Sequence, residues 1–161
     1  MKIQLYTDGS CDVHGSKVGG YAVVKGPWEQ GKGDIEHIIK SGAKSDTTNN
    51  EMELTAIREA VQWSIENDTP VVIKSDSQYA IKSIAEWSQN WRWNEEQQQY
   101  FKKNGDKVKN SSLIREIKVL IKNAPEIAFE HVKGHDTDAL NNFADCIANE
   151  MRKQREEEGG E

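Results

Sequence analysis

Two aspartates, Asp8 and Asp76, each follow a stretch with the pattern of a β-strand. Residues 2–7 alternate between two faces and are stopped by Asp8-Gly9-Ser10, and residues 71–75 begin with three β-branched side chains. If these strands are parallel neighbours, both carboxylates emerge at the sheet edge where open α/β folds bind ligands. Taken singly, each aspartate is more simply a turn former. Taken together, at two equivalent strand ends, they favour a functional site.

A third acid comes from the stretch Thr47–Leu54, TTNNEMEL, which holds Glu51 and Glu53. Thr48 and Glu51 have the spacing of a capping box, in which the threonine caps a helix and the glutamate bonds back to its backbone N–H. Glu53 has no such role, and it lies about 100° from Leu54 on the helical wheel. From there it can reach the edge bearing the two aspartates. A first-turn acid favoured by the helix dipole explains Glu53 equally well from spacing alone.

Three converging carboxylates without a basic partner repel one another unless they bind divalent cations. Ligand sets made only of oxygen suit Mg²⁺ or Mn²⁺ rather than zinc. Two such ions about 4 Å apart can activate a water and stabilise the leaving oxygen in phosphodiester cleavage. The three acids therefore predict a metal-dependent phosphodiesterase site.

The remaining pattern supplies the elements that must position these acids. A helix is predicted from the stripe Leu54, Ile57, Val61 and Ile65. The order βββαβααβα predicts an α/β domain with a mixed sheet. We expect strands at 2–7, 21–25, 35–40, 71–75 and 127–132, and further helices at 78–90, 113–123 and 140–151. Residues 153–161 have nothing to bury and are predicted to form a disordered tail.

Composition narrows the class of protein. A chain of 161 residues, 35% hydrophobic and 30% charged, suits one globular domain. Cys11 and Cys146 have no CxxC spacing, and neither a signal peptide nor a membrane-spanning run is evident, so we expect a cytoplasmic protein that acts as a monomer, away from membranes. The net charge of −6 argues against a generic nucleic-acid binder, but not against a site whose acids are neutralised by metal ions.

The segments that could do chemistry occur in the order and near the spacing of a known family. The sequence resembles type 1 ribonuclease H, the ribonuclease HI group, over roughly residues 1–152. The matching segments are TDGSC at 7–11, GGYA at 19–22, TTNNEMEL at 47–54, SDSQY at 75–79, NW at 90–91 and VKGH at 132–135. The resemblance implies a ribonuclease H-like fold with a mixed five-stranded sheet and flanking helices. It implies that residues 1–152 are a catalytic domain that hydrolyses the RNA strand of RNA–DNA hybrids with two Mg²⁺ ions, with Mn²⁺ as a substitute, leaving 5′-phosphate and 3′-hydroxyl ends.

Two alternatives on the same fold are a non-catalytic hybrid-binding module and a nuclease that acts on DNA. The intact set of acids argues against the first, and the TTNN and SDSQY segments argue against the second.

By this resemblance, the four catalytic acids and metal ligands are Asp8, Glu53, Asp76 and Asp145. Periodicity alone places Asp145 off the apolar stripe of its helix, where a solvated acid is the ordinary explanation. Asp136 and Asp138 compete for its role, although Asp138 is better explained as a helix N-cap. His135, in the loop after the last strand, matches the family histidine thought to assist proton transfer or product release.

The resemblance also implies substrate contacts. Polar residues that face the hybrid match Cys11, Asn49, Asn50 and Gln78, and residues that hold a DNA phosphate match Thr48 and Asn90. Residues 92–109 correspond to the basic protrusion of the family, here longer and less basic than in well-known bacterial members. Its expected contacts are Lys102, Lys103, Lys107 and Lys109, while Trp87 and Trp91 are expected to be mostly core.

Overall fold

The computed structural model describes residues 2–27, 31, 34–133 and 139–159. In chain order the elements are β1 (Ile3–Cys11), β2 (Gly19–Lys25), the 3-10 helix η1 (Asp34–His37), β3 (Ile38–Lys44), α1 (Asn49–Glu66), β4 (Val71–Ser75), α2 (Gln78–Ala85), the 3-10 helix η2 (Trp87–Asn90), β5 (Arg92–Asn94), β6 (Gln99–Phe101), α3 (Ser111–Lys122), β7 (Ile127–His131) and α4 (Ala139–Gly159). The predicted order is confirmed, with a small hairpin, β5–β6, added between α2 and α3.

One mixed five-stranded sheet forms the centre of the domain, with the strand order β3-β2-β1-β4-β7. The first three strands form an antiparallel meander, while β4 pairs in parallel with both β1 and β7. This mixture follows from the connections, since no α-helix among the described residues separates the strands of the meander, whereas α1 precedes β4 and α2 and α3 precede β7. The predicted fold class is therefore confirmed.

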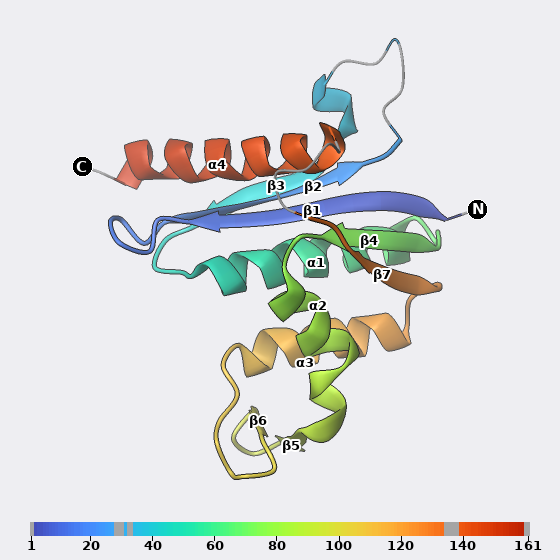
Figure 1. The fold of residues 1–161 in the computed structure, drawn as a ribbon, viewed down its shortest axis with the longest axis vertical. Helices are drawn as coiled ribbons and strands as arrows, with labels where there is room; N and C mark the ends of the chain where they lie inside the picture. The colour runs from blue at the N-terminus through green and yellow to red at the C-terminus, as the bar shows by residue number, and fades with distance from the viewer. Residues whose placement is uncertain (1, 28–30, 32–33, 134–138, 160–161) are drawn as a thin grey trace.

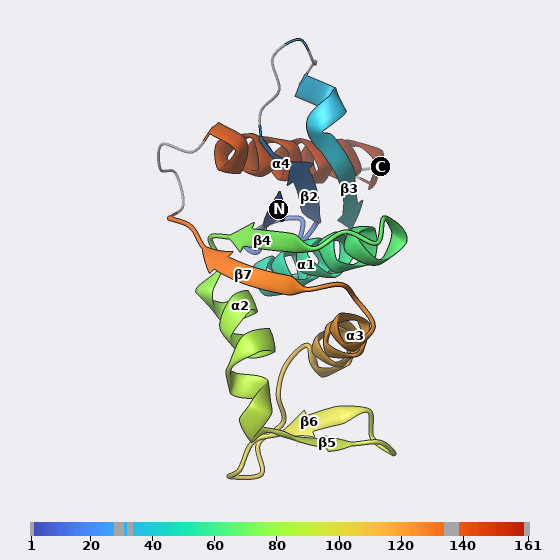
Figure 2. The same cartoon turned by 90° about the vertical axis from the view of Figure 1, so that its right-hand side faces the viewer.

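Helices cover the two faces of the sheet unequally (Figures 1 and 2). The larger core packs the α1 stripe Leu54, Ile57 and Val61, each fully buried, against one face of the sheet, with α2 and α3 beyond it. The smaller core lies on the opposite face, where Leu140 and Ala144 of α4 meet Tyr6 and Val24. The predicted α1 stripe is thus confirmed by its burial.

The β5–β6 hairpin lies at the end of the molecule away from α4 (Figure 1). Its strands place Trp93 opposite Tyr100, and the two rings pack edge to face with centroids 4.9 Å apart. Trp91 also packs against Tyr100, at a centroid distance of 5.8 Å. The expectation that Trp87 belongs mostly to the core is wrong, because this residue is 38% exposed.

Several boundaries differ from the predicted ones. Strand β1 continues to Cys11, because its antiparallel pairing with β2 carries on past Asp8. The predicted helix 78–90 divides into α2 and η2. The prediction of a disordered tail at 153–161 is wrong for its described part, because α4 continues to Gly159. None of the helices in the described part of the chain combines the length and apolar character that a membrane span requires.

Candidate active site

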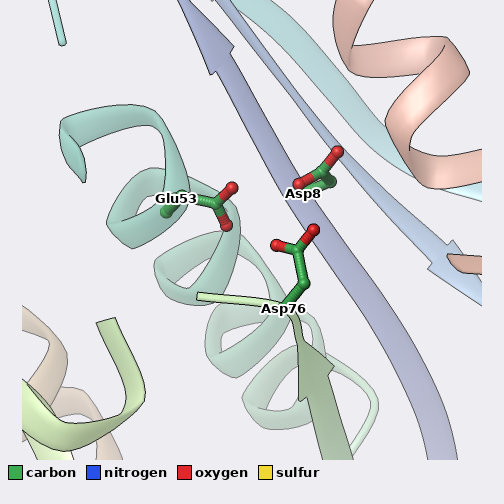
Figure 3. Close-up of side chains that lie close together, drawn as sticks. All are labelled: Asp8, Glu53 and Asp76. Carbon is green, nitrogen blue, oxygen red and sulfur yellow. The ribbon is translucent and has the colours of Figure 1, made fainter. Parts of the chain in front are cut away.

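Three carboxylates from three separate elements meet where the parallel pairing of β1 and β4 ends. One oxygen each of Asp8, Glu53 and Asp76 lies within 4.8 Å of the others. Figure 3 shows their side chains pointing toward one another from β1, α1 and the end of β4. The sequence predicted this convergence, and the structure brings all three acids together.

The strand register explains why the two aspartates are neighbours. Parallel pairing between β1 and β4 ends at Tyr6 and Lys74. Asp8 and Asp76 each follow two residues later, so they lie at equivalent positions beyond the last parallel pair. Asp8 is therefore not at the end of its strand as predicted, but at the end of that strand's pairing with β4.

Helix α1 supplies the third acid. Thr48 caps the helix, with its hydroxyl accepting a hydrogen bond from the Glu51 backbone N–H at 3.1 Å. Glu53 follows in the first turns and is 8% exposed. A cap at Thr48 therefore fixes where the helix begins, and with it the point at which Glu53 reaches the sheet.

Burial makes this cluster electrostatically unfavourable when all its members are charged. Desolvation, followed by repulsion from Glu53, raises the pKa of Asp8 far above its ordinary value. Desolvation is also the largest cause that raises the pKa of Glu53 to about 8; repulsion from Asp76 adds to it, and contacts with Asp8, Gly9 and Ser75 oppose it.

The donor set suits a divalent cation. Asp8 Oδ2 and Glu53 Oε2 are buried and accept no hydrogen bond from the described residues. Buried polar atoms ordinarily have partners. Unpartnered carboxylate oxygens aimed at a common point are the ligands that hard cations such as Mg²⁺ or Mn²⁺ prefer. The residues present therefore fit a metal ion.

The fourth predicted acid, Asp145, approaches from α4 on the other face of the sheet. Its side chain lies near enough to Asp8 to help raise the pKa of that carboxyl group. Asn149, one turn further along α4, donates from Nδ2 to the Asp145 backbone oxygen at 3.1 Å and to its carboxylate Oδ1 at 3.4 Å. Asp145 is therefore a neighbour of the three-acid cluster. The competing Asp136 and Asp138 lie outside the described residues.

Glu51 is not one of the three clustered acids, and the predicted capping box forms only in part. Its carboxylate accepts hydrogen bonds from the Thr47 hydroxyl and from Lys44 Nζ, rather than from the Thr48 backbone N–H. Burial disfavours the charge, but these two bonds outweigh it and lower the pKa of Glu51. Glu51 is thus a charged structural residue that ties α1 to the end of β3.

Among the histidines, His135 lies outside the described residues. His131 is exposed at the end of β7, where it pairs with Ser75 in the sheet, and its Nε2 lies 3.2 Å from the Asp76 backbone oxygen. No local pattern distinguishes this histidine, because the contact depends on the β4–β7 register.

The predicted substrate residues outside the protrusion lie mostly on the surface. Thr48, Asn49, Asn50, Gln78 and Asn90 are exposed at the ends of α1, α2 and η2, and Cys11 is half-buried, with its Sγ 3.3 Å from the Thr47 backbone oxygen.

A groove of about 250 Å³ runs between Asn50 and the protrusion formed by residues 92–109. It places Asn50 of α1 in one lining with Lys102, Lys107 and Lys109, although more than 50 residues separate them in the chain. Trp87 and Trp91 also line this groove, and Lys103 does not.

Comparison with known proteins agrees with this geometry. The RNase H family model matches residues 1–153. The chain belongs to the RNase H family. A ribonuclease H from Ruthia magnifica subsp. Calyptogena magnifica is 36% identical over 148 residues, which cover 92% of this chain and 93% of that relative. One from Caldicellulosiruptor saccharolyticus is 34% identical over 95% of this chain and 97% of that relative.

The fold comparison points the same way. The structure of the foamy viral protease-reverse transcriptase in complex with dsDNA superposes with a TM-score of 0.72, covering 94% of each chain. At 24% identity this likeness bears on the fold alone. The family resemblance inferred from the sequence is thus confirmed, and the protein is a ribonuclease H enzyme.

Proposed function

We propose that this RNase H family member is an endonuclease that hydrolyses the RNA strand of RNA–DNA hybrids by a two-metal-ion mechanism. The products are expected to carry 5′-phosphate and 3′-hydroxyl ends. We further propose that the protein acts as a monomer in the cytoplasm.

The observation that carries this proposal is the Asp8–Glu53–Asp76 cluster, with its ligand oxygens within 4.8 Å of one another. These three carboxylates, with Asp145 beside Asp8, would hold the cations. Mg²⁺ or Mn²⁺ bound there would activate the attacking water and stabilise the leaving oxygen. His135 is proposed to assist proton transfer or product release.

The protein's own surface would supply the recognition of the hybrid. We propose that Cys11, Asn49, Asn50 and Gln78 contact the minor groove, where the 2′-hydroxyl distinguishes RNA from DNA. Thr48 and Asn90 would hold a phosphate of the DNA strand. The lysines that share the groove with Asn50 support a path for the nucleic-acid backbone toward the protrusion.

The decisive experiment compares labelled RNA–DNA hybrid, duplex RNA and duplex DNA, each with Mg²⁺, Mn²⁺ or a chelator. We expect cleavage of the hybrid's RNA strand alone, and only with a metal ion. The variants Asp8→Asn, Glu53→Gln and Asp76→Asn should each lose this cleavage by about 100-fold or more. Full activity in any of the three would refute the proposed site.

The same assay separates the alternatives. Binding of the hybrid without turnover would identify a non-catalytic binding module, and cleavage of duplex DNA would identify a DNA-acting nuclease. Analysis of the product ends tests the proposed chemistry, because a 3′-phosphate would contradict it.

A further inference from the structure

We propose that Ser10 and Asn149 form a positioning pair that holds the Asp145 carboxylate beside Asp8. The inference rests on the proposed function and deepens it, since it concerns how the fourth acid is kept in place. Neither residue is one that we expect to touch the substrate or the metal ion.

The pair links the two elements that carry these acids. Ser10 lies on β1 two residues after Asp8, so the alternation of a strand places both side chains on the face that α4 covers. Its hydroxyl donates to Asn149 Oδ1 at 2.6 Å. Asn149 lies one helical turn after Asp145, on the same side of α4.

The acceptors around Asn149 decide which way its amide points. The backbone carbonyl of Asp145 can only accept a hydrogen bond, so the amide nitrogen must face it, and the same nitrogen then faces the Asp145 carboxylate oxygen. The amide oxygen then faces Ser10, which donates to it. If Ser10 could not donate, the amide could turn over and present its oxygen to the carboxylate, which would repel Asp145.

A glycine permits this approach of helix to strand. Gly20 on β2 pairs with Ser10 in the sheet. A Cβ at Gly20 would lie 2.1 Å from the Ala148 backbone oxygen and 2.7 Å from the Arg152 nitrogen. The absence of a side chain lets α4 pack directly on the strands, which brings Asn149 within hydrogen-bonding distance of Ser10.

Asp145 needs such support because it lies beside another carboxyl group, that of Asp8. In the fully ionised state that would bind a cation, Asp8 and Asp145 repel each other, so the Asp145 side chain needs a fixed partner to stay in place. The Nδ2 contact with its carboxylate is long at 3.4 Å and constrains Asp145 only if Asn149 is itself fixed. The shorter bond from Ser10 provides that fixation.

Losing this pair should weaken the metal site more than the substrate site. Residues that orient metal ligands typically contribute 10- to 100-fold in metal affinity or activity. For Asn149→Ala we expect the Mg²⁺ concentration at half-maximal cleavage to rise about 10-fold. The KM for hybrid at saturating Mg²⁺ should stay unchanged. Ser10→Ala should shift the metal requirement in the same direction.

Direct metal binding provides a readout independent of activity. Mn²⁺ titrated into each protein without substrate, with free Mn²⁺ followed by electron paramagnetic resonance, should show weaker binding in both variants. Thermal melts in chelator test whether the variants are simply unfolded. Lys153→Ala is the matched control, since Lys153 is exposed on the same helix; this variant should behave like the wild-type protein.

The double variant Ser10→Ala/Asn149→Ala decides whether the two residues act as a unit. We expect it to be no worse than Asn149→Ala alone, because Ser10 acts only through Asn149. Losses that multiply in the double variant, or an unchanged Mn²⁺ affinity in Asn149→Ala, would overturn the inference. Failure of the proposed function looks different, because then the wild-type protein itself would not cleave the hybrid.

Discussion

Gly9 and Glu53 are in direct backbone contact: a Cβ on Gly9 would lie 2.4 Å from the Glu53 nitrogen. The same Cβ would lie 2.4 Å from the carbonyl carbon of Met52. Strand β1 therefore touches the first turns of α1 immediately after Asp8. This contact lets a carboxylate on a helix meet carboxylates at the strand ends.

Gly9→Ala should consequently disturb the site and the fold together. The atoms in the way belong to the backbone, so no side-chain rotation relieves the clash, and overpacking of this kind costs about 1–3 kcal/mol. We expect a lower melting temperature and a strong loss of hybrid cleavage. Gly42→Ala is the control, because the three atoms nearest its Cβ would all belong to the Tyr21 side chain rather than to backbone. Wild-type activity in Gly9→Ala would contradict this account.

The clustered acids should destabilise the metal-free protein, so replacing one of them with a neutral residue should make it more stable. Asp8 is buried, its Oδ2 has no described partner, and its pKa is raised by burial and by Glu53. An amide at this position carries no charge, so Asp8→Asn should raise stability in chelator by about 1 kcal/mol or more at neutral pH. Cleavage should be lost in the same variant. Thermal melts test this, with Glu157→Gln on the exposed face of α4 as a charge-matched control.

The same repulsion predicts a pH dependence. Folding raises the pKa of Glu53 from 4.5 to about 8. Between pH 4.5 and about 8, Glu53 therefore holds a proton in the folded protein that it has released in the unfolded chain. The stability of the metal-free protein should therefore fall as pH rises through this window. Excess Mg²⁺ should remove the fall by neutralising the carboxylates. Thermal melts across this pH range, with Mg²⁺ and with chelator, test this prediction. A melting temperature in chelator that rises with pH would contradict it.

The two glutamates of TTNNEMEL should separate stability from activity. Glu51 bonds to Lys44 and Thr47, so Glu51→Gln should cost about 0.5–1.5 kcal/mol in unfolding free energy. Its hybrid cleavage at saturating substrate should remain near that of the wild-type protein. Glu53→Gln should lose cleavage without losing stability. Denaturant melts and cleavage assays on both variants check the contrast, and the reverse pattern would reassign the catalytic role.

The sequence predicted the parts of the fold that depend on periodicity and strand order. The α1 stripe and the Asp8–Asp76 pair follow from apolar spacing and from parallel pairing. The length of α4 does not follow from burial, because the residues after Met151 carry no apolar stripe. Its last turns instead combine helix-forming residues with an Arg152–Glu156 pair and an Arg155–Ser45 hydrogen bond. The contacts of His131 with Asp76 and of Asn149 with Ser10 join elements that are distant in the chain, so no local pattern contains them.

The protrusion lysines should contribute to hybrid binding according to their position. Lys107 lines the groove that also holds Asn50, whereas Lys103 is exposed outside it. Removing one lysine that neutralises a phosphate should reduce the slope of log affinity against log salt by about 0.7–0.9. Lys107→Ala should therefore weaken hybrid binding and lower the slope by about this amount, and Lys103→Ala should change both less.

A quadruple variant sets the upper limit of the contribution that the protrusion lysines make to hybrid affinity. It changes Lys102, Lys103, Lys107 and Lys109 to Ala. Binding of hybrid measured in chelator over a range of salt concentrations separates it from catalysis. An unchanged affinity would show that the protrusion does not hold the substrate. Equal losses in the two single variants would instead mean that the lysines act through overall charge, because only one of the two lines the groove.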